Sequence, residues 1–334
     1  MPRRITWSLI SWLVVVPFAQ AGPPAWVMLT NSAGFSPRDS CGELVYKDRL
    51  WILGGWMDSF KEPPRDVWSS ADGIQWTRAT NQAPWKHSDF PMTVVFKDRM
   101  WIMGGWHGGR LPGASASNSV WSSTDGIEWK METAAAEWSP RMSGGLLVFK
   151  DRLWLFGGVQ KYYFGDDHDL KNDVWSSTDG VHWERITEAA PWLPRAYITP
   201  IALHGRMYIF GGGNYLPNYQ ANNDVWASAD GVQWTQEAAH AAWSPRIWFS
   251  AVNYRERMWI LGGWSNNPSR NWADVWYSAD GKAWSELKVS NGWKERHEHS
   301  AYVFQDKLWV VGGHAQPLNS EVWQLQLPED WNGE

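Results

Sequence analysis

The chain repeats one pattern of apolar and polar positions about every fifty residues. In each repeat a short apolar run ends in a pair of glycines, and these pairs begin at Gly54, Gly104, Gly157, Gly211, Gly262 and Gly312. A Val-Trp pair follows each of them, and five repeats continue into Ser-x-Asp-Gly-x-x-Trp, as in SADGIQW ending at Trp76. Short apolar runs bounded by turn residues predict β-strands.

The spacing inside the repeats is nearly constant. Each unit start precedes its first glycine by 16 residues, and the late tryptophan precedes the next unit start by 12 residues. Only the segment between the glycine pair and Val-Trp varies in length. The six unit starts are Arg38, Ser88, Arg141, Arg195, Arg246 and Arg296.

Each unit holds four predicted strands, which in the first unit are 43–46, 49–53, 66–69 and 75–77. Asp-Gly between the third and fourth strands, and Lys-Asp-Arg between the first and second, predict tight turns. A four-stranded unit cannot bury both faces alone, so units with this period stack around an axis. The predicted fold is therefore all-β, a six-bladed β-propeller of four-stranded antiparallel blades.

The two ends of the chain complement each other. The sixth unit lacks its Asp-Gly-x-x-Trp strand, whereas Trp26 lies 12 residues before Arg38, as the late tryptophan does elsewhere. An N-terminal strand that completes the last blade would close the ring and leave no open sheet edge. We therefore expect residues 22–334 to form a single propeller.

Residues 1–21 have the pattern of a secretory signal peptide. Arg3 and Arg4 precede an apolar run, and Ala19-Gln20-Ala21 fits a cleavage site. We expect an exported protein, periplasmic or extracellular, with no membrane span after signal removal, and we expect a monomer. A net charge of −5 without a basic cluster excludes nucleic acid as a partner, and one cysteine, Cys41, excludes an intrachain disulfide.

The repeats resemble kelch repeats of the secreted bacterial type. The resemblance rests on the diglycine, the Pro-Arg at unit starts, the late tryptophan and the aromatic residue before the diglycine, such as Trp51. The Ser-x-Asp-Gly-x-x-Trp turns also resemble the Asp-boxes of sialidases, although they are shorter, and in such families the Asp-box is a structural turn. Kelch propellers include protein-binding modules, a copper-radical sugar oxidase and a sialic-acid epimerase, so the resemblance implies a fold and leaves the function open.

All the length variation lies in loops between the second and third strands, which share one end of a propeller. Insertions confined to one face are typical of a binding face. The predicted function is therefore a binding module for a glycan or a protein on this variable-loop face, although aromatic rings there could also cover the blade tops. The candidate ligand-binding residues are Trp56, Trp106, Trp264, Tyr162, Tyr163, Tyr215, Asp89 and His107.

Comparison between units isolates the residues that do not repeat. The arginines at five of the unit starts recur, which favours salt bridges or hydrogen bonds that tie the blades together, although a ring of arginines at the channel mouth could instead bind an anion. The same recurrence argues against an arginine triad for catalysis. The polar exceptions gather where the last blade meets the first, and they are His297, His299, His314, Asp39 and Glu43.

Three uses of this cluster stay open. His297, His314, Glu43 and Asp39 are the catalytic candidates for an acid–base enzyme acting on a sugar, such as an epimerase, a lyase or a sialidase-like hydrolase. His297, His299 and His314 are candidate ligands for a divalent metal, because imidazole suits zinc or copper. The third use is a polar network that stabilises ring closure. The leading hypothesis is binding without catalysis, and no cofactor is expected.

Overall fold

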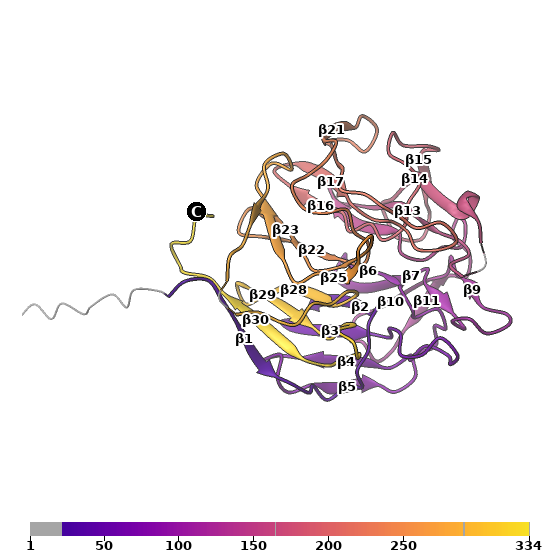
Figure 1. Ribbon diagram of the computed structural model, residues 1–334. Helices are drawn as coiled ribbons and strands as arrows, with labels where there is room; N and C mark the ends of the chain where they lie inside the picture. Colours follow the sequence, from indigo (N-terminus) through magenta and orange to yellow (C-terminus); the bar gives the residue numbers. More distant parts are fainter. Residues whose placement is uncertain (1–21, 164, 290, 334) are drawn as a thin grey trace, which may run out of the picture.

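The computed structural model describes residues 22–163, 165–289 and 291–333, so the predicted signal peptide lies outside the described residues. Six four-stranded antiparallel sheets surround one axis (Figure 1). The inner strands of adjacent sheets contact one another around the whole ring. These observations confirm the predicted all-β, six-bladed propeller.

The first three blades, each given from the axis outwards, are built from the following strands. Blade one holds β2 (Gly42–Tyr46), β3 (Arg49–Leu53), β4 (Val67–Ser70) and β5 (Thr77–Thr80). Blade two holds β6 (Met92–Phe96), β7 (Arg99–Met103), β10 (Val120–Ser123) and β11 (Lys130–Thr133). Blade three holds β12 (Gly145–Phe149), β13 (Arg152–Val159), β14 (Leu170–Ser177) and β15 (Glu184–Thr187).

The remaining blades follow the same order. Blade four holds β16 (Ile201–Leu203), β17 (Arg206–Phe210), β20 (Val225–Ser228) and β21 (Thr235–Ala238). Blade five holds β22 (Ser250–Tyr254), β23 (Arg257–Leu261), β26 (Val275–Ser278) and β27 (Ser285–Glu286). Blade six holds β28 (Ser300–Phe304), β29 (Lys307–Val311), β30 (Val322–Gln326) and β1 (Ala25–Thr30).

Short elements decorate the variable loops. Three two-stranded ribbons rise from blades two, four and five, and a 3-10 turn, η1 (Asp167–Asp169), lies in the loop of blade three. The ribbons are β8 (Trp106–His107) with β9 (Ser115–Ala116), β18 (Gly213–Asn214) with β19 (Gln220–Ala221), and β24 (Trp264–Asn266) with β25 (Ser269–Asn271). Among the described residues, no helix is long and apolar enough to cross a membrane.

The outer strand of the first blade begins later than the predicted 75–77. The Asp72 carboxylate accepts the backbone N–H groups of Ile74 and Gln75, and the Trp76 indole donates to Gly73 O. These bonds hold residues 72–76 in a turn, so β5 starts only at Thr77. The side chain of Asp72 competes with the sheet for backbone donors, which a strand pattern does not reveal.

The core lies between adjacent blades. Trp51 of blade one packs over the Asp-Gly turn of blade two, and a Cβ at Gly126 would lie 2.2 Å from the Trp51 ring. Gly126 has a φ of 74°, so both its backbone conformation and this close approach favour glycine. The repeated tryptophan and the repeated glycine are therefore two sides of one contact between blades.

The prediction that the recurring arginines tie blades together is wrong, because each forms a buried brace inside its own blade. Arg141 donates through Nη1 to Asp173 Oδ1 at 2.6 Å and to Gly157 O at 2.9 Å, and through Nη2 to Asp173 Oδ2 at 2.9 Å. Arg38, Arg195 and Arg246 make the equivalent contacts with Asp66, Asp224 and Asp274. Arg296 differs, because it donates through Nη2 to Glu321 and through Nη1 to Asn319 Oδ1. The four Asp pairs are bidentate. These bidentate pairs join the unit start to the glycine pair and to the third strand.

The ring closes through β1, which pairs with β30 and places Trp26 opposite Leu325. Figure 1 shows the indigo β1 beside the yellow β30. Trp26 is 1 % exposed and meets Trp293 edge to face, with ring centroids 6.0 Å apart. The predicted closure by the N-terminal strand is thus confirmed.

Removing the Trp26 side chain tests this closure. We expect Trp26→Ala to lower the free energy of unfolding by about 3–5 kcal/mol, because a large buried ring is lost from a packed seam. Met28 lies on the same strand but is 46 % exposed, so Met28→Ala should change stability by less than about 0.5 kcal/mol. Urea denaturation followed by tryptophan fluorescence measures both, and equal losses would contradict a seam sealed by Trp26.

Candidate functional site

Six residues form a collar around the axis, one from each blade, which we name the axial ring. Each lies two positions after its unit start and has a positive φ between 48° and 61°. Backbone hydrogen bonds join neighbours, as from Ser40 N–H to Glu298 O at 3.1 Å and from Phe90 N–H to Ser40 O at 3.1 Å. Non-glycine residues held at positive φ often mark functional sites. The axial ring comprises Ser40, Phe90, Ser143, Tyr197, Trp248 and Glu298.

The axial ring borders two cavities. A cleft of about 350 Å³ opens on the variable-loop face, and every one of the six variable loops contributes at least one residue to its lining. A second chamber, of about 200 Å³, is lined by the inner strands. We call them the loop-face cleft and the inner chamber. Ser40, Phe90, Trp248 and Glu298 line both.

One wall of the loop-face cleft is a continuous group of aromatic rings. Tyr162 and Tyr163 lie with ring centroids 4.1 Å apart. Tyr215 lies 4.7 Å from Trp248, which in turn lies 5.2 Å from Trp264. Such rings combine large apolar faces with a polar tip, so they suit contact with an extended ligand.

The floor of the loop-face cleft carries three carboxyl groups around one hydroxyl. Ser40 Oγ is 3.2 Å from Asp39 Oδ1 and 3.2 Å from Glu298 Oε2. A hydroxyl carries one proton, so the second bond requires that one of these carboxyl groups donates its own. Asp89 also lines the floor, is 1 % exposed and has no hydrogen-bond partner at Oδ1.

Burial dominates the protonation of these acids. It raises the pKa of Asp39, and it raises the pKa of both Asp89 and Glu298 well above their usual range. The charge of Asp39 adds to the increase in pKa at each of the other two acids. Like charges in one buried site oppose each other, so ionisation of one of these carboxyl groups disfavours ionisation of the others.

Two histidines stand beside Asp39 at the seam of blades six and one. His314 Nδ1 lies 3.5 Å from Asp39 Oδ2, and the rings of His297 and His314 lie 4.8 Å apart between their centroids. His297 Nδ1 is 2.6 Å from Asn271 Oδ1, and its ring stacks on Trp248 at 5.0 Å. Burial lowers the pKa of His297 to about 3, with a further decrease from the charge of His314.

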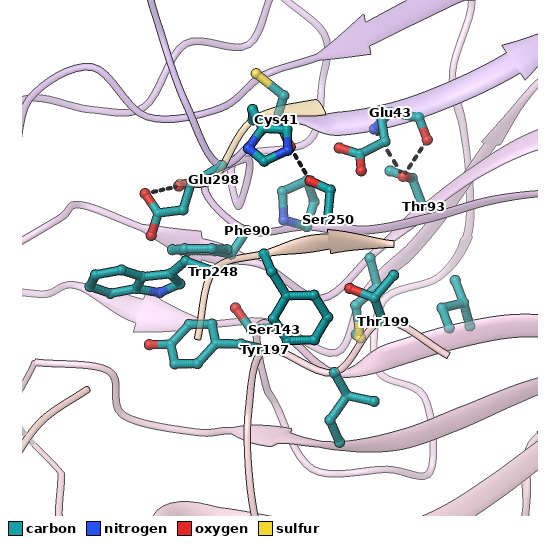
Figure 2. Close-up of a pocket in the computed structure, with 18 of the residues that line it drawn as sticks. Cys41, Glu43, Phe90, Thr93, Ser143, Tyr197, Thr199, Trp248, Ser250 and Glu298 are labelled. Atoms are coloured by element: carbon teal, nitrogen blue, oxygen red, sulfur yellow. Dashed lines mark hydrogen bonds between the residues drawn. The ribbon is translucent and has the colours of Figure 1, made fainter. Parts of the chain in front are cut away.

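The inner chamber holds the other two polar residues of the predicted cluster. Glu43 and His299 line this chamber and not the loop-face cleft. Figure 2 shows Glu43 with Thr93, whose hydroxyl joins the Glu43 backbone at 3.1 and 3.2 Å, while the axial-ring residues Phe90, Tyr197, Trp248 and Glu298 border the same space. The axial ring thus separates Glu43 and His299 from Asp39, His297 and His314.

The structure places six of the eight predicted ligand-binding residues in the loop-face cleft and two outside its lining. Trp106 is buried beneath Tyr162 and Tyr163, with its indole N–H donated to Gly109 O, and His107 lies outside the cleft with its Nδ1 3.2 Å from Lys86 O. The remaining six line the loop-face cleft: Trp56, Trp264, Tyr162, Tyr163, Tyr215 and Asp89.

Several lining residues escape sequence reasoning, among them Ser40, Phe90, Trp248 and Glu298. In an extended strand, residues one, three and five positions after a unit start, such as Asp39, Cys41 and Glu43, would share one face, and the residue at the second position would point to the other face. The positive φ at the second position turns that residue to the axis instead. The sequence feature that could have identified these residues is their common position, two residues after each unit start.

This arrangement supports three kinds of chemistry. Aromatic walls over an acidic floor suit recognition of a ligand. The Asp39–His314 pair could exchange a proton with a bound molecule. Asp39, His297 and His314 could also hold a metal ion, since one ligand atom from each lies within 4.8 Å of the others.

Comparison with known proteins agrees with the fold. A family model described as the KLHDC2/KLHL20/DRC7 Kelch-repeats domain matches residues 92–313. The chain is also similar to the dynein alpha chain of the flagellar outer arm of Chlamydomonas reinhardtii, with 33 % identity over 150 residues. That match covers 42 % of this chain and 3 % of the dynein chain, so it concerns a small part of that relative.

Glu43 makes the stability of the propeller depend on pH. Burial raises the pKa of Glu43 to about 8 from its ordinary value of 4.5. Its titratable neighbours are Cys41 and Tyr302, and burial raises the pKa of both. Because folded Glu43 keeps its proton to a higher pH than the unfolded chain does, we expect the contribution of Glu43 to wild-type stability to fall as pH rises from about 4.5 to 8.

Glu43→Gln removes this dependence because glutamine does not ionise. We expect the Tm of Glu43→Gln, relative to the wild type, to be higher at pH 8 than at pH 5. The exposed Glu184→Gln is the control and should show no such trend. A Tm difference for Glu43→Gln that stays constant between these pH values would contradict the assignment.

Proposed function

We propose that this chain, which belongs to the kelch-repeat family, is a recognition module that binds a segment of a protein partner in its loop-face cleft. The observation that carries the proposal is the convergence of all six variable loops on one cleft. Kelch propellers are protein-interaction modules, and loops on a rigid scaffold are the usual place for recognition residues. Binding of this kind needs no cofactor and is compatible with a monomer.

The chemistry of the loop-face cleft supports a peptide ligand. Buried aromatic anchors in a concave, well-packed site carry most of the binding energy of protein interfaces. Tyr163, Tyr215 and Trp264 are partly exposed and line the cleft, so they can contact a side chain that enters it. Arg110 lies at the same wall, with its guanidinium 4.6 Å from the Tyr163 ring centroid, and can meet a carboxylate of the ligand.

A glycan is the other ligand that these residues fit, because aromatic faces and carboxyl groups also contact sugar rings. We further propose that the protein acts outside the cytoplasm, in the periplasm or the extracellular space. This location rests on the signal-peptide pattern of residues 1–21.

Selection from a random peptide library on the intact protein tests the recognition proposal. We expect selected peptides to bind the wild type and to bind Trp264→Ala at least tenfold more weakly, because the variant removes a wall of the loop-face cleft. Phe60→Ala is the matched control, since Phe60 is an aromatic residue of the same face that is 70 % exposed and lies outside the cleft.

Three outcomes would contradict peptide recognition. The library could yield no binder, its binders could be insensitive to Trp264→Ala, or a glycan array could give the only ligand that Trp264→Ala weakens. Fluorescence anisotropy with labelled peptides and the array itself provide the affinities.

A sugar-acting enzyme, such as an epimerase, a lyase or a sialidase-like hydrolase, is the second candidate function. It is favoured by the Asp39–His314 pair, because the His314 side chain is 30 % exposed and lines the loop-face cleft. Glu43 lies in the inner chamber, so this candidate would use Asp39, His297 and His314 without it.

Proton exchange at a sugar carbon distinguishes the two functions. We expect no deuterium incorporation when free hexoses or N-acetylneuraminate are incubated with the protein in D2O, and no release of methylumbelliferone from its sialoside. Turnover that Asp39→Asn abolishes, with an unchanged Tm, would instead establish the enzyme. NMR spectroscopy and fluorescence are the measurements.

A further inference from the structure

We propose that Asp39, His297 and His314 form a binding site for one divalent transition-metal ion. The three residues meet at the seam of blades six and one, on the floor of the loop-face cleft. One ligand atom from each lies within 4.8 Å of the others. This inference is independent of the proposed function, because a metal ion here requires no protein partner.

The two histidines are held in place by contacts that leave ring nitrogens available. Their backbones pair, with His314 N–H donated to His297 O at 2.9 Å. Asn271 ties them together as well, since its Nδ2 donates to His314 O at 3.1 Å while its Oδ1 faces His297 Nδ1 at 2.6 Å. The amide is thereby oriented, so His297 Nδ1 must carry the proton and Nε2 presents a lone pair. Metal-binding histidines are commonly oriented in this way.

The two carboxylate oxygens of Asp39 have different environments. Ser40 Oγ contacts Oδ1, whereas Oδ2 is buried without a hydrogen-bond partner and lies 3.5 Å from His314 Nδ1. Two ligands that each bind a tetrahedral zinc ion at about 2.0–2.1 Å lie about 3.3 Å apart. The separation of Asp39 Oδ2 and His314 Nδ1 is therefore close to that of two ligands on one ion.

A separate observation points to a cation at this place. Asp89 lies on the same floor, nearly fully buried, and its Oδ1 has no hydrogen-bond partner. Among the described residues that line the loop-face cleft, Arg110 carries the one guanidinium or ammonium group, and it lies over Tyr163. Burial disfavours the ionised form of these carboxyl groups, and a cation bound at the seam would favour it.

The donor set indicates the class of ion. Two imidazoles and one carboxylate suit zinc, copper, nickel or iron, and calcium or magnesium prefer oxygen ligands. Three protein ligands leave a coordination position, as in open zinc sites. His299, a candidate ligand from the sequence, lies in the inner chamber against Trp293 and is replaced in this set by Asp39.

Titration of the tag-free protein with Zn²⁺ after chelator treatment tests the site. We expect one equivalent to bind by calorimetry, and Co²⁺ to give a visible absorption band of mixed nitrogen and oxygen ligation. Asp39→Asn and His314→Ala should each weaken Zn²⁺ binding at least tenfold. His107→Ala is the matched control, because His107 and His87 form a second histidine pair with centroids 5.7 Å apart outside the cleft.

Three results would overturn the proposal. The first is that Zn²⁺ shows no saturable binding at one equivalent. The second is that Asp39→Asn and His314→Ala bind Zn²⁺ as tightly as the wild type does. The third is that His107→Ala loses Zn²⁺ binding instead. Far-UV circular dichroism checks that each variant folds, and His314→Gln replaces His314→Ala if that variant does not. Trp264→Ala should keep full Zn²⁺ affinity, so failure of the metal site and failure of peptide recognition are separately visible.

Discussion

The structure depends on one constraint: a blade of four short strands can bury its faces only against two neighbours. Five of the blades satisfy it with consecutive sequence, and the sixth does so only when β1 pairs with β30. This pairing covers Trp26 and removes the open sheet edges that a linear stack would expose. It also brings Asp39, near the start of the chain, against His314, near its end. The candidate site is thus a consequence of ring closure.

Repetition separates scaffold from site in this protein. The braces from arginine to a carboxylate, the Trp51–Gly126 type of contact and the turns around residues such as Asp72 recur from blade to blade, and each satisfies buried polar groups or fills space between blades. The axial ring, in contrast, uses one backbone position in all six blades but fills it with serine, phenylalanine, tyrosine, tryptophan or glutamate. One backbone arrangement, repeated six times, can therefore present different side chains to a single axial space.

The candidate site was partly predictable. Asp39, His297 and His314 stood out because they break the repeat, and Asp89 was a candidate ligand-binding residue. The structure places all four on the loop-face cleft. Glu43 and His299 stood out because they also break the repeat, but they line the inner chamber. Spacing along a strand gives the face of a side chain, whereas the axial ring with its positive φ values interrupts the alternation that this inference assumes.

The sequence by itself determined the number of blades, the strand order within them and the closure by an N-terminal strand. These features follow from local periodicity and constant spacing, which are properties of the chain read in one dimension. Tertiary structure alone decided which polar residues meet, because the axial ring places Glu298 and Trp248 in the lining of both cavities and separates the loop-face cleft from the inner chamber. It also decided their protonation, since the desolvation that raises the pKa of Asp89 exists only once six blades have excluded water from the axis.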